Sequence, residues 1–283
     1  MKKLQNMRIN PRTGQKIAKT LIWVAAVFVM AILATVILDI LIKGLPVVSW
    51  QFLTQTPRNM GREGGISSTI VGTMLVTIVA VIIAAPFGIG TAFYLAEYTR
   101  EGVVTRIIRF SAESLAGIPS IVYGLFGFIF FVTYLNMGWS VLSGGLTMAI
   151  MILPTIIRTS EEAILTVPKS YREVSYSLGG TKWQTISRAV FPSAIRGIAN
   201  GIILSVGRSV AETAAVLLTA GSSLHMPTSL FKPARTMAVH FYTLATEGIS
   251  MENAYGTAAL LIILVFLINV VANMLLNRFI TKK

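Results

Sequence analysis

Two ionisable side chains, Arg208 and Glu212, stand near the middle of an apolar run that covers residues 197–220. On insertion scales each charge costs about 2.5–3.5 kcal/mol at the centre of a membrane helix, so neither side chain is expected to face lipid. The guanidinium of arginine is a planar, permanently charged fork that fits a tetrahedral oxyanion. We therefore predict that Arg208 contacts an anion, while Glu212 holds the arginine and moderates its affinity when no anion is bound.

Small and hydroxyl-bearing residues share the predicted face of this helix. At intervals of three, four and seven along that face lie Gly201, Ser205, Arg208, Glu212 and Thr219. Ser209 follows Arg208 directly, and Ser120 follows Gly117 and Pro119 at a turn whose amides could point at an anion. The predicted substrate pathway is lined by Arg208, Glu212, Ser205, Ser209 and Ser120. The alternatives are a salt bridge that locks two helices together and, at Pro119, a simple kink.

The elements that must position these residues are apolar. Hydrophobic residues make up 54% of the 283-residue chain, charged residues only 12%, against about 25% in soluble domains, and the mean hydropathy is +0.73. Runs long enough to span a bilayer as helices cover residues 21–42, 70–95, 115–135, 141–157, 197–220 and 256–276. Because lipid offers backbone amides no partner, we predict an all-α integral membrane protein with six transmembrane helices. Gly197, Gly201 and Ser205, four residues apart, predict that a neighbouring helix approaches the fifth span closely.

The basic residues predict the orientation of the spans. Most lysines and arginines fall in segments 1–19, 100–109, 158–196 and 278–283, which alternate spans place on one side, so both termini are predicted to be cytoplasmic. The predicted organisation is a basic N-terminal segment (1–19), the first helix and an outer loop (20–65), a transmembrane core (66–277) that contains the loop 158–196, and a basic C-terminal tail (278–283). Segments 43–65 and 221–255 are predicted to lie outside, where they can contact a soluble partner.

Several kinds of chemistry are not expected from this composition. The net charge of +13 follows the membrane flanks and does not cluster with aromatic residues on one soluble face, which argues against nucleic acid binding. The chain has no cysteine, and we expect its two histidines, His225 and His240, to be solvated or interfacial and to bind no metal. It also lacks the glycine-lysine pair of a phosphate-cradling nucleotide loop and any Ser/His/Asp arrangement. We predict no catalytic residue, no metal and no bound cofactor, so that any ATP and Mg²⁺ must be held by another chain.

The loop 158–196 is basic, long and flanked by apolar runs, and it contains REVSYSLGGTKWQTISRAVFPSAI (172–195). Glu173 lies near the start of a possible helix, where its charge suits the helix dipole, and Gly179 with Gly180 can end that helix. Pro192 is predicted to interrupt the next helix. A structured basic insert between two spans predicts a docking site for a soluble cytoplasmic protein. The alternative is an amphipathic loop that lies on lipid headgroups.

The spacing of Glu173, Gly179 and Pro192 resembles the EAA motif of type I ABC importer permeases, although Val174 and Ser175 replace its two alanines. From Gly64 onward the chain is similar to the phosphate-specific permeases PstA and PstC, through GGISSTIVGTM, LAGIPSIVYGLFG and GRSVAETAAVLLTAG. LAEYTREG resembles PstA, and SLFKPART (229–236) is similar to PstC; PstA is the closer match. The resemblance implies that Glu173, Gly179, Gly180 and Pro192 form an ATPase-coupling loop.

By this resemblance the chain forms half of the translocation pathway of an ATP-driven phosphate importer in the cytoplasmic (inner) membrane of a bacterium or archaeon. The implied partners are a second, PstC-like permease, a PstB-like ATPase dimer that binds ATP and Mg²⁺, and an extracytoplasmic PstS-like phosphate-binding protein. The alternatives are a permease for another oxyanion, an ATP-independent channel or carrier in which Arg208 and Glu212 form a gate, and a membrane scaffold. A scaffold has no need of a polar stripe inside the fifth helix.

Overall fold

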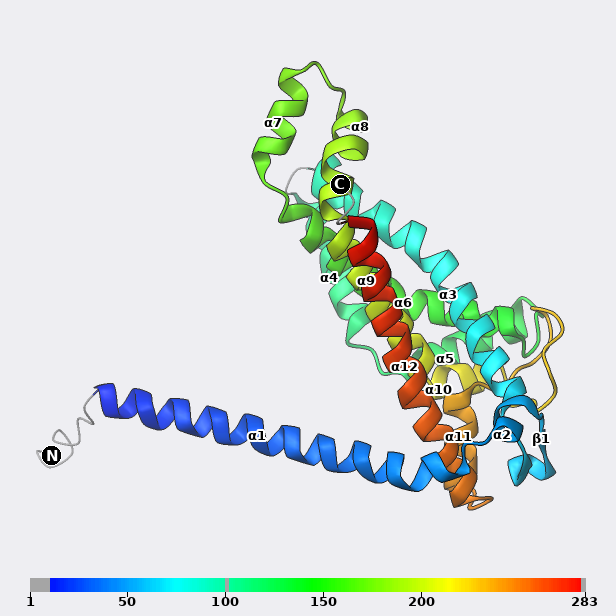
Figure 1. Ribbon diagram of the computed structural model, residues 1–283. Coiled ribbons are helices and arrows are strands. Elements are labelled where there is room, and N and C mark those ends of the chain that lie inside the picture. The colour runs from blue at the N-terminus through cyan, green and yellow to red at the C-terminus, as the bar shows by residue number, and fades with distance from the viewer. Residues whose placement is uncertain (1–10, 100–101, 281–283) are drawn as a thin grey trace, which may run out of the picture.

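The computed structural model describes residues 11–99 and 102–280, and most of this part of the chain is helical (Figure 1). The long helices are α1 (Pro11–Gly44), α3 (Ser67–Phe93), α4 (Val103–Ala116), α6 (Val141–Leu165), α9 (Phe191–Ala211) and α12 (Met251–Ile280). The short ones are α2 (Trp50–Thr54), α5 (Ser120–Gly127), α7 (Lys169–Ser177), α8 (Lys182–Thr185), α10 (Ala214–Thr219) and α11 (Met237–Thr246). Two-residue strands, β1 (Pro57–Arg58) and β2 (Glu63–Gly64), pair antiparallel. The prediction of an all-α membrane fold is confirmed.

Three stretches are π-helical. They are η3 (Tyr94–Tyr98), which continues α3, η4 (Phe128–Tyr134), which continues α5, and η5 (Ile186–Val190), which joins α8 to α9. In the described part of the chain five helices are long and apolar enough to cross a membrane, and the count rises to six if the bent pair of α4 with α5 and η4 is one span. The span that begins at Lys182 runs through η5 to Ala211 without a break.

The core lies where α3, α6 and α9 pack together. Its centre is apolar and includes Val76, Ala80, Met148, Ile152 and Ile156. Close packing depends on small residues at the helix contacts. The Cα of Gly197 lies against Ala163 of α6, and Gly201 lies against Thr159, so that a side chain at either glycine would collide with α6. The predicted close approach along the fifth span is therefore confirmed, and α6 is the neighbour.

Helix α1 stands apart from this core. It meets the rest of the chain only near its C-terminal end, where Gly44 packs against Tyr255 and Ala259 of α12, and it then extends away from the bundle (Figure 1). None of its apolar span is buried within the chain. This arrangement does not test the predicted boundaries between the basic N-terminal segment, the first helix with its outer loop, the core and the C-terminal tail. Helix α1 begins at Pro11, and residues 1–10 and 281–283 of the two predicted basic ends lie outside the described residues.

Two of the six predicted spans are broken. The span predicted over 115–135 is a helix pair bent by 100° between Ala116 and Ser120. Pro119 disfavours helical backbone at the residue before it, and it precedes the first turn of α5. The span predicted over 197–220 ends at Ala211, and α10 begins at Ala214. The expectation of single continuous helices over these two stretches was wrong.

The end of the bundle opposite α7 is closed by α11 and a short loop. Asn253 of α12 donates from Nδ2 to the carbonyl oxygens of Gly61 and Arg62, each at 3.0 Å. Arg62 donates from Nε to the carbonyl oxygen of Ile249 at 3.1 Å. The loop between β1 and β2 is thereby fixed onto the start of α12. These residues belong to the segments predicted to lie outside the membrane.

Within this closed end His240 is 1% exposed, so the expectation of a solvated or interfacial histidine was wrong for it, whereas His225 is exposed. Its Nδ1 lies 3.4 Å from a guanidinium nitrogen of Arg235, which can only donate, so Nδ1 accepts and carries no proton. Burial, and then the charge of Arg235, lower the pKa of His240 from 6.5 to about 4. Helix α11, which carries it, is not among the candidate membrane spans.

We expect the folded protein to lose stability as the pH falls below 6.5. Because the folded-state pKa of His240 is depressed, the unfolded state binds the proton first, and the stability present above pH 6.5 is lost progressively down to about pH 4. At pH 5 the loss is about 2 kcal/mol. Melting in detergent should therefore show a larger drop in Tm from pH 7.5 to 5.0 for wild type than for His240→Gln. His225→Gln is the matched control, and an equal drop in wild type and His240→Gln would contradict this assignment.

Candidate functional site

The fifth span breaks at Glu212, and the break changes the predicted geometry of the Arg208–Glu212 pair. Glu212 has extended backbone angles, φ −75° and ψ 134°, and its amide bonds to the carbonyl oxygen of Ser209 at 3.3 Å. A carboxylate oxygen of Glu212 accepts from the amide of Ala215 at 3.4 Å, in the first turn of α10. In the described ranges no ion pair joins Arg208 to Glu212. The prediction that Glu212 holds Arg208 in place is therefore not met in this structure, because the helix ends between the two residues.

Arg208 is exposed on the last turn of α9, whereas the predicted hydroxyl residues beside it are mostly turned inward. The hydroxyl of Ser205 donates to the carbonyl oxygen of Gly201 at 2.9 Å, and Ser209 donates to the hydroxyl of Thr77 on α3 at 3.3 Å. Thr219 is fully buried on α10 and bonds to Ala215, so it does not continue the face of Arg208. The predicted common face is therefore divided: Gly201, Ser205 and Ser209 pack within the bundle while the guanidinium faces outward.

Ser120, the remaining predicted pathway residue, is the first residue of α5 and is half-buried. The bend before it is held by Tyr123, whose hydroxyl donates to the carbonyl oxygen of Leu115 at 2.7 Å. Helix α5 packs closely on α10, since a side chain at Gly124 would lie 2.9 Å from the Cα of Ala215. The two broken spans thus contact each other beyond their breaks, through α5 and α10; Ser120 begins the first of these helices and Glu212 directly precedes the second.

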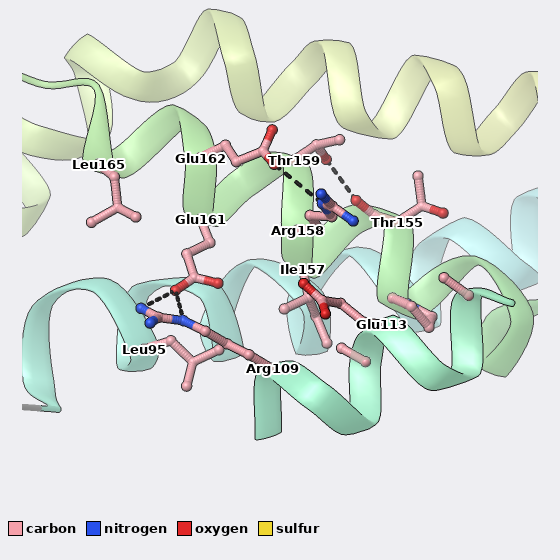
Figure 2. A pocket seen from close by; sticks show the side chains of 13 residues that line it. Leu95, Arg109, Glu113, Thr155, Ile157, Arg158, Thr159, Glu161, Glu162 and Leu165 are labelled. Atoms are coloured by element: carbon pink, nitrogen blue, oxygen red, sulfur yellow. Dashed lines mark hydrogen bonds and ion pairs between the residues drawn. The ribbon is translucent and has the colours of Figure 1, made fainter. Parts of the chain in front are cut away.

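A cavity of about 370 Å³ lies between α4 and the C-terminal half of α6 (Figure 2). Charged side chains from both helices line it: Arg109, Glu113, Arg158, Glu161 and Glu162. Arg109 joins the two helices, with Nε 2.8 Å and a terminal nitrogen 2.7 Å from one oxygen of Glu161, which is 8% exposed. Arg158 and Glu162 form an exposed pair within α6 at 3.2 Å. The sequence analysis did not identify this cross-helix pair, because a separation of 52 residues has no periodicity to reveal it.

Helix α7 projects beyond the bundle on a loop between α6 and α8, at one end of the molecule (Figure 1). None of its nine residues is buried, and Tyr171, Val174 and Leu178 at its end expose large apolar side chains. Glu173 is also exposed. A helix with an apolar face and no covering element in its own chain is typical of a docking surface for another protein.

The end of α7 follows the predicted glycine turn. Gly179 has a φ of +77°, and its amide bonds to the carbonyl oxygen of Tyr176 at 2.9 Å. The amide of Gly180 bonds to the carbonyl oxygen of Ser175 at 3.0 Å, which completes a Schellman motif. The prediction for Pro192 was wrong: it lies where the π-helical segment η5 passes into α9, and the helix continues through it from Lys182 to Ala211.

This arrangement defines an integral membrane protein whose helix bundle carries one projecting helix outside the apolar spans. The sequence pattern of the family described as "Binding-protein-dependent transport system inner membrane component" matches residues 84–282. The chain belongs to this family, the permease subunits of type I ABC importers.

Several relatives extend over most of the chain. A protein of Bacillus subtilis (strain 168) called "Probable ABC transporter permease protein YqgI" is 33% identical over 94% of this chain and 96% of its own length. The "Phosphate transport system permease protein PstA" of Pasteurella multocida (strain Pm70) is 33% identical over 91% of this chain and 92% of its own. The protein named PstA 1 of Mycobacterium tuberculosis (strain ATCC 25618 / H37Rv) is 38% identical over 78% of this chain and 71% of its own.

Solved structures of low sequence identity share the fold. A chain of the bacterial alginate ABC transporter in complex with an alginate-bound periplasmic protein superimposes with a TM-score of 0.67 at 13% identity, covering 95% of this chain and 96% of its own. A chain of the inward-facing MetNI methionine ABC transporter gives a TM-score of 0.61 at 19% identity, covering 74% and 93%.

Proposed function

We propose that this chain is a PstA-like permease subunit that forms half of the translocation pathway of an ATP-driven phosphate importer. The observation that carries the importer assignment is α7, an unburied helix with an apolar face that projects from the membrane bundle. Phosphate as the substrate is supported by the relatives named PstA and by the exposed guanidinium of Arg208 near the break in the fifth span. Arg208 would offer a bidentate, charge-assisted contact to a phosphate oxygen pair.

The proposed partners follow from the surfaces of the chain. A PstC-like permease completes the pathway and offers apolar surface to α1, whose span is uncovered by its own chain. A PstB-like ATPase dimer, which holds ATP and Mg²⁺, docks on α7 through Tyr171, Val174 and Leu178. A PstS-like binding protein delivers phosphate at the opposite end, where α11 and the β1–β2 loop close the bundle. Both chain termini lie on the ATPase side in this proposal.

In the proposed cycle the binding protein docks outside, and ATP-driven closure of the ATPase dimer displaces the loop 158–196. The displacement passes from α7 to the helices on either side of it. The helices then rock and expose Arg208 alternately to the two sides of the membrane. Ser120 and Glu212, which adjoin the two breaks, would lie where a broken helix can pivot.

The test is ATP-dependent uptake in liposomes that contain this chain, its neighbouring permease, the ATPase and the binding protein. We expect radiolabelled phosphate to accumulate only when ATP is present on the ATPase side, and excess unlabelled sulfate or molybdate not to compete. Competition by sulfate or molybdate would reassign the substrate to another oxyanion. Accumulation without ATP hydrolysis would replace the importer with a channel or carrier.

A further inference from the structure

Helix α7 has few connections to the bundle that it must move. None of its residues is buried, and the large apolar side chains of Tyr171, Val174 and the following Leu178 are exposed. The hydroxyls of Ser175 and Thr185 lie 2.8 Å apart and join α7 to α8. Among the described residues, the charged contact between α7 and the membrane-spanning helices is made by the side chain of Arg172.

The guanidinium of Arg172 makes four hydrogen bonds to two different elements. Its Nε and one terminal nitrogen donate to one carboxylate oxygen of Glu97, at 2.9 and 2.6 Å. The terminal nitrogens also donate to the carbonyl oxygens of Val167 at 2.8 Å and Ile164 at 3.0 Å. Glu97 belongs to η3 at the end of α3, and Ile164 lies in the last turn of α6. One side chain therefore connects α7 to the ends of two core helices.

This contact differs from an ordinary surface ion pair. The side chains of Arg172 and Glu97 are only 18% and 6% exposed, so both charges are largely withdrawn from water and a lost partner would leave the other unpaired. The guanidinium also satisfies carbonyl groups at the C-terminus of α6, where a positive charge suits the helix dipole. The Lys43–Asp39 pair of α1 differs, because it joins two residues of one helix and its side chains remain 51% and 48% exposed.

We propose that Arg172 is a positioning residue that clamps α7 to α3 and α6, so that a displacement of α7 moves both spans as one body. The inference rests on the proposed function, because it takes α7 as the element that the ATPase displaces. The inference depends on the geometry of the guanidinium: a lysine has three donors on a single nitrogen and cannot reproduce four hydrogen bonds that start from three separate nitrogens. Without the clamp, α7 moves on its flexible connections and the spans do not follow.

The test begins with a distance that needs no substrate. The chain has no cysteine, so when it is labelled before assembly with its partners, spin labels attach only at introduced sites. Suitable sites are Ile82, 66% exposed on α3, and Ser177, which is exposed on α7 about a quarter turn from the face of Val174 and Leu178. In the assembled complex we expect a narrow Ile82–Ser177 distance distribution that broadens in Arg172→Gln and Arg172→Lys. The control variant Lys43→Gln should leave it narrow.

The second measurement is phosphate moved per ATP hydrolysed by the reconstituted complex. We expect Arg172→Gln to assemble with the ATPase and hydrolyse ATP but to lower this ratio about tenfold. Glu97→Gln should lower it less, because the carbonyl contacts of Arg172 remain, and the double variant should match Arg172→Gln. An unchanged distance distribution overturns the clamp, and so does a wild-type coupling ratio in Arg172→Gln or loss of ATPase assembly. If the wild-type complex moves no phosphate, the proposed function is wrong. The Ile82–Ser177 distances would still test whether Arg172 holds α7 to the ends of α3 and α6.

Discussion

Replacing Gly179 with valine is expected to uncouple ATP hydrolysis from transport in the assembled complex. Gly179 has a φ of +77° in the Schellman motif that ends α7, and a β-branched residue is strained in that conformation whatever space surrounds it. The strain of about 1–2 kcal/mol or more is relieved when the turn opens. Opening removes the hydrogen bonds of Gly179 and Gly180 to Tyr176 and Ser175, and it changes the direction in which α7 presents its apolar face. We expect phosphate transported per ATP to fall at least about tenfold while basal ATP hydrolysis persists.

The matched control for this substitution is Gly138→Val. Gly138 also has a positive φ, +65°, and open space at its Cβ position, but it lies in the connection between η4 and α6 at the other end of the bundle. The two variants thus carry the same kind of local strain in different places. Membrane insertion and ATPase assembly are checked for both by purification of the complex. Wild-type coupling in Gly179→Val would refute the assignment of the loop, and equal losses in both variants would indicate general destabilisation.

Replacing Arg208 with glutamine is expected to abolish most phosphate uptake without disassembling the complex. The guanidinium is exposed on α9 and has no ion pair with Glu212, so its removal leaves no buried charge unpaired within the described part of the chain. A lost charge-assisted hydrogen bond of about 1.5–3 kcal/mol corresponds to a loss of roughly 10- to 150-fold in the rate of uptake at low phosphate concentration. Arg208→Lys should retain part of the uptake, since it keeps the charge but loses the fork.

The control for Arg208 is Arg278→Gln, which removes an exposed arginine from the last turn of α12. We expect this variant to transport phosphate like wild type. The measurement is ATP-dependent uptake of radiolabelled phosphate over a range of concentrations, with the binding protein saturated. If Arg208→Gln transports phosphate normally, the chain remains an importer subunit, but Arg208 has no contact with the substrate.

The position of the spans could be predicted from the sequence, because lipid requires long uninterrupted apolar runs and continuous helical hydrogen bonding. The breaks could not be predicted in the same way. Near Pro119 the sequence indicated a turn but gave no angle. At Glu212 no proline or glycine marks the break; the chain turns where α10 packs closely on Gly124 of α5, which is a tertiary contact. The role of Glu212 therefore changed from a partner of Arg208 to a cap of α10.

The ion pairs between different helices also could not be predicted from the spacing of residues in the sequence. Periodicity identifies neighbours three or four residues apart on one helix, and the i,i+4 pair of Arg158 and Glu162 is of that kind. Glu97 and Arg172 are 75 residues apart, and they meet only because α3 and α6 end side by side. The burial of His240 has a similar origin, since it depends on the β1–β2 loop folding over α11. Both the Glu97–Arg172 pair and the burial of His240 depend on packing between segments that are far apart in the sequence.

The π-helical segments determine which way the ends of the spans face. A π-helical turn holds one residue more than an α-helical turn, so every side chain beyond it is rotated by about 100° relative to an uninterrupted helix. Glu97 lies inside such a segment, η3, and its orientation toward Arg172 depends on that additional residue. The number of residues in η3 therefore sets the angle at which Glu97 meets Arg172 on α7, and a single insertion or deletion there would turn Glu97 away from Arg172 and displace the buried side chain of Leu95.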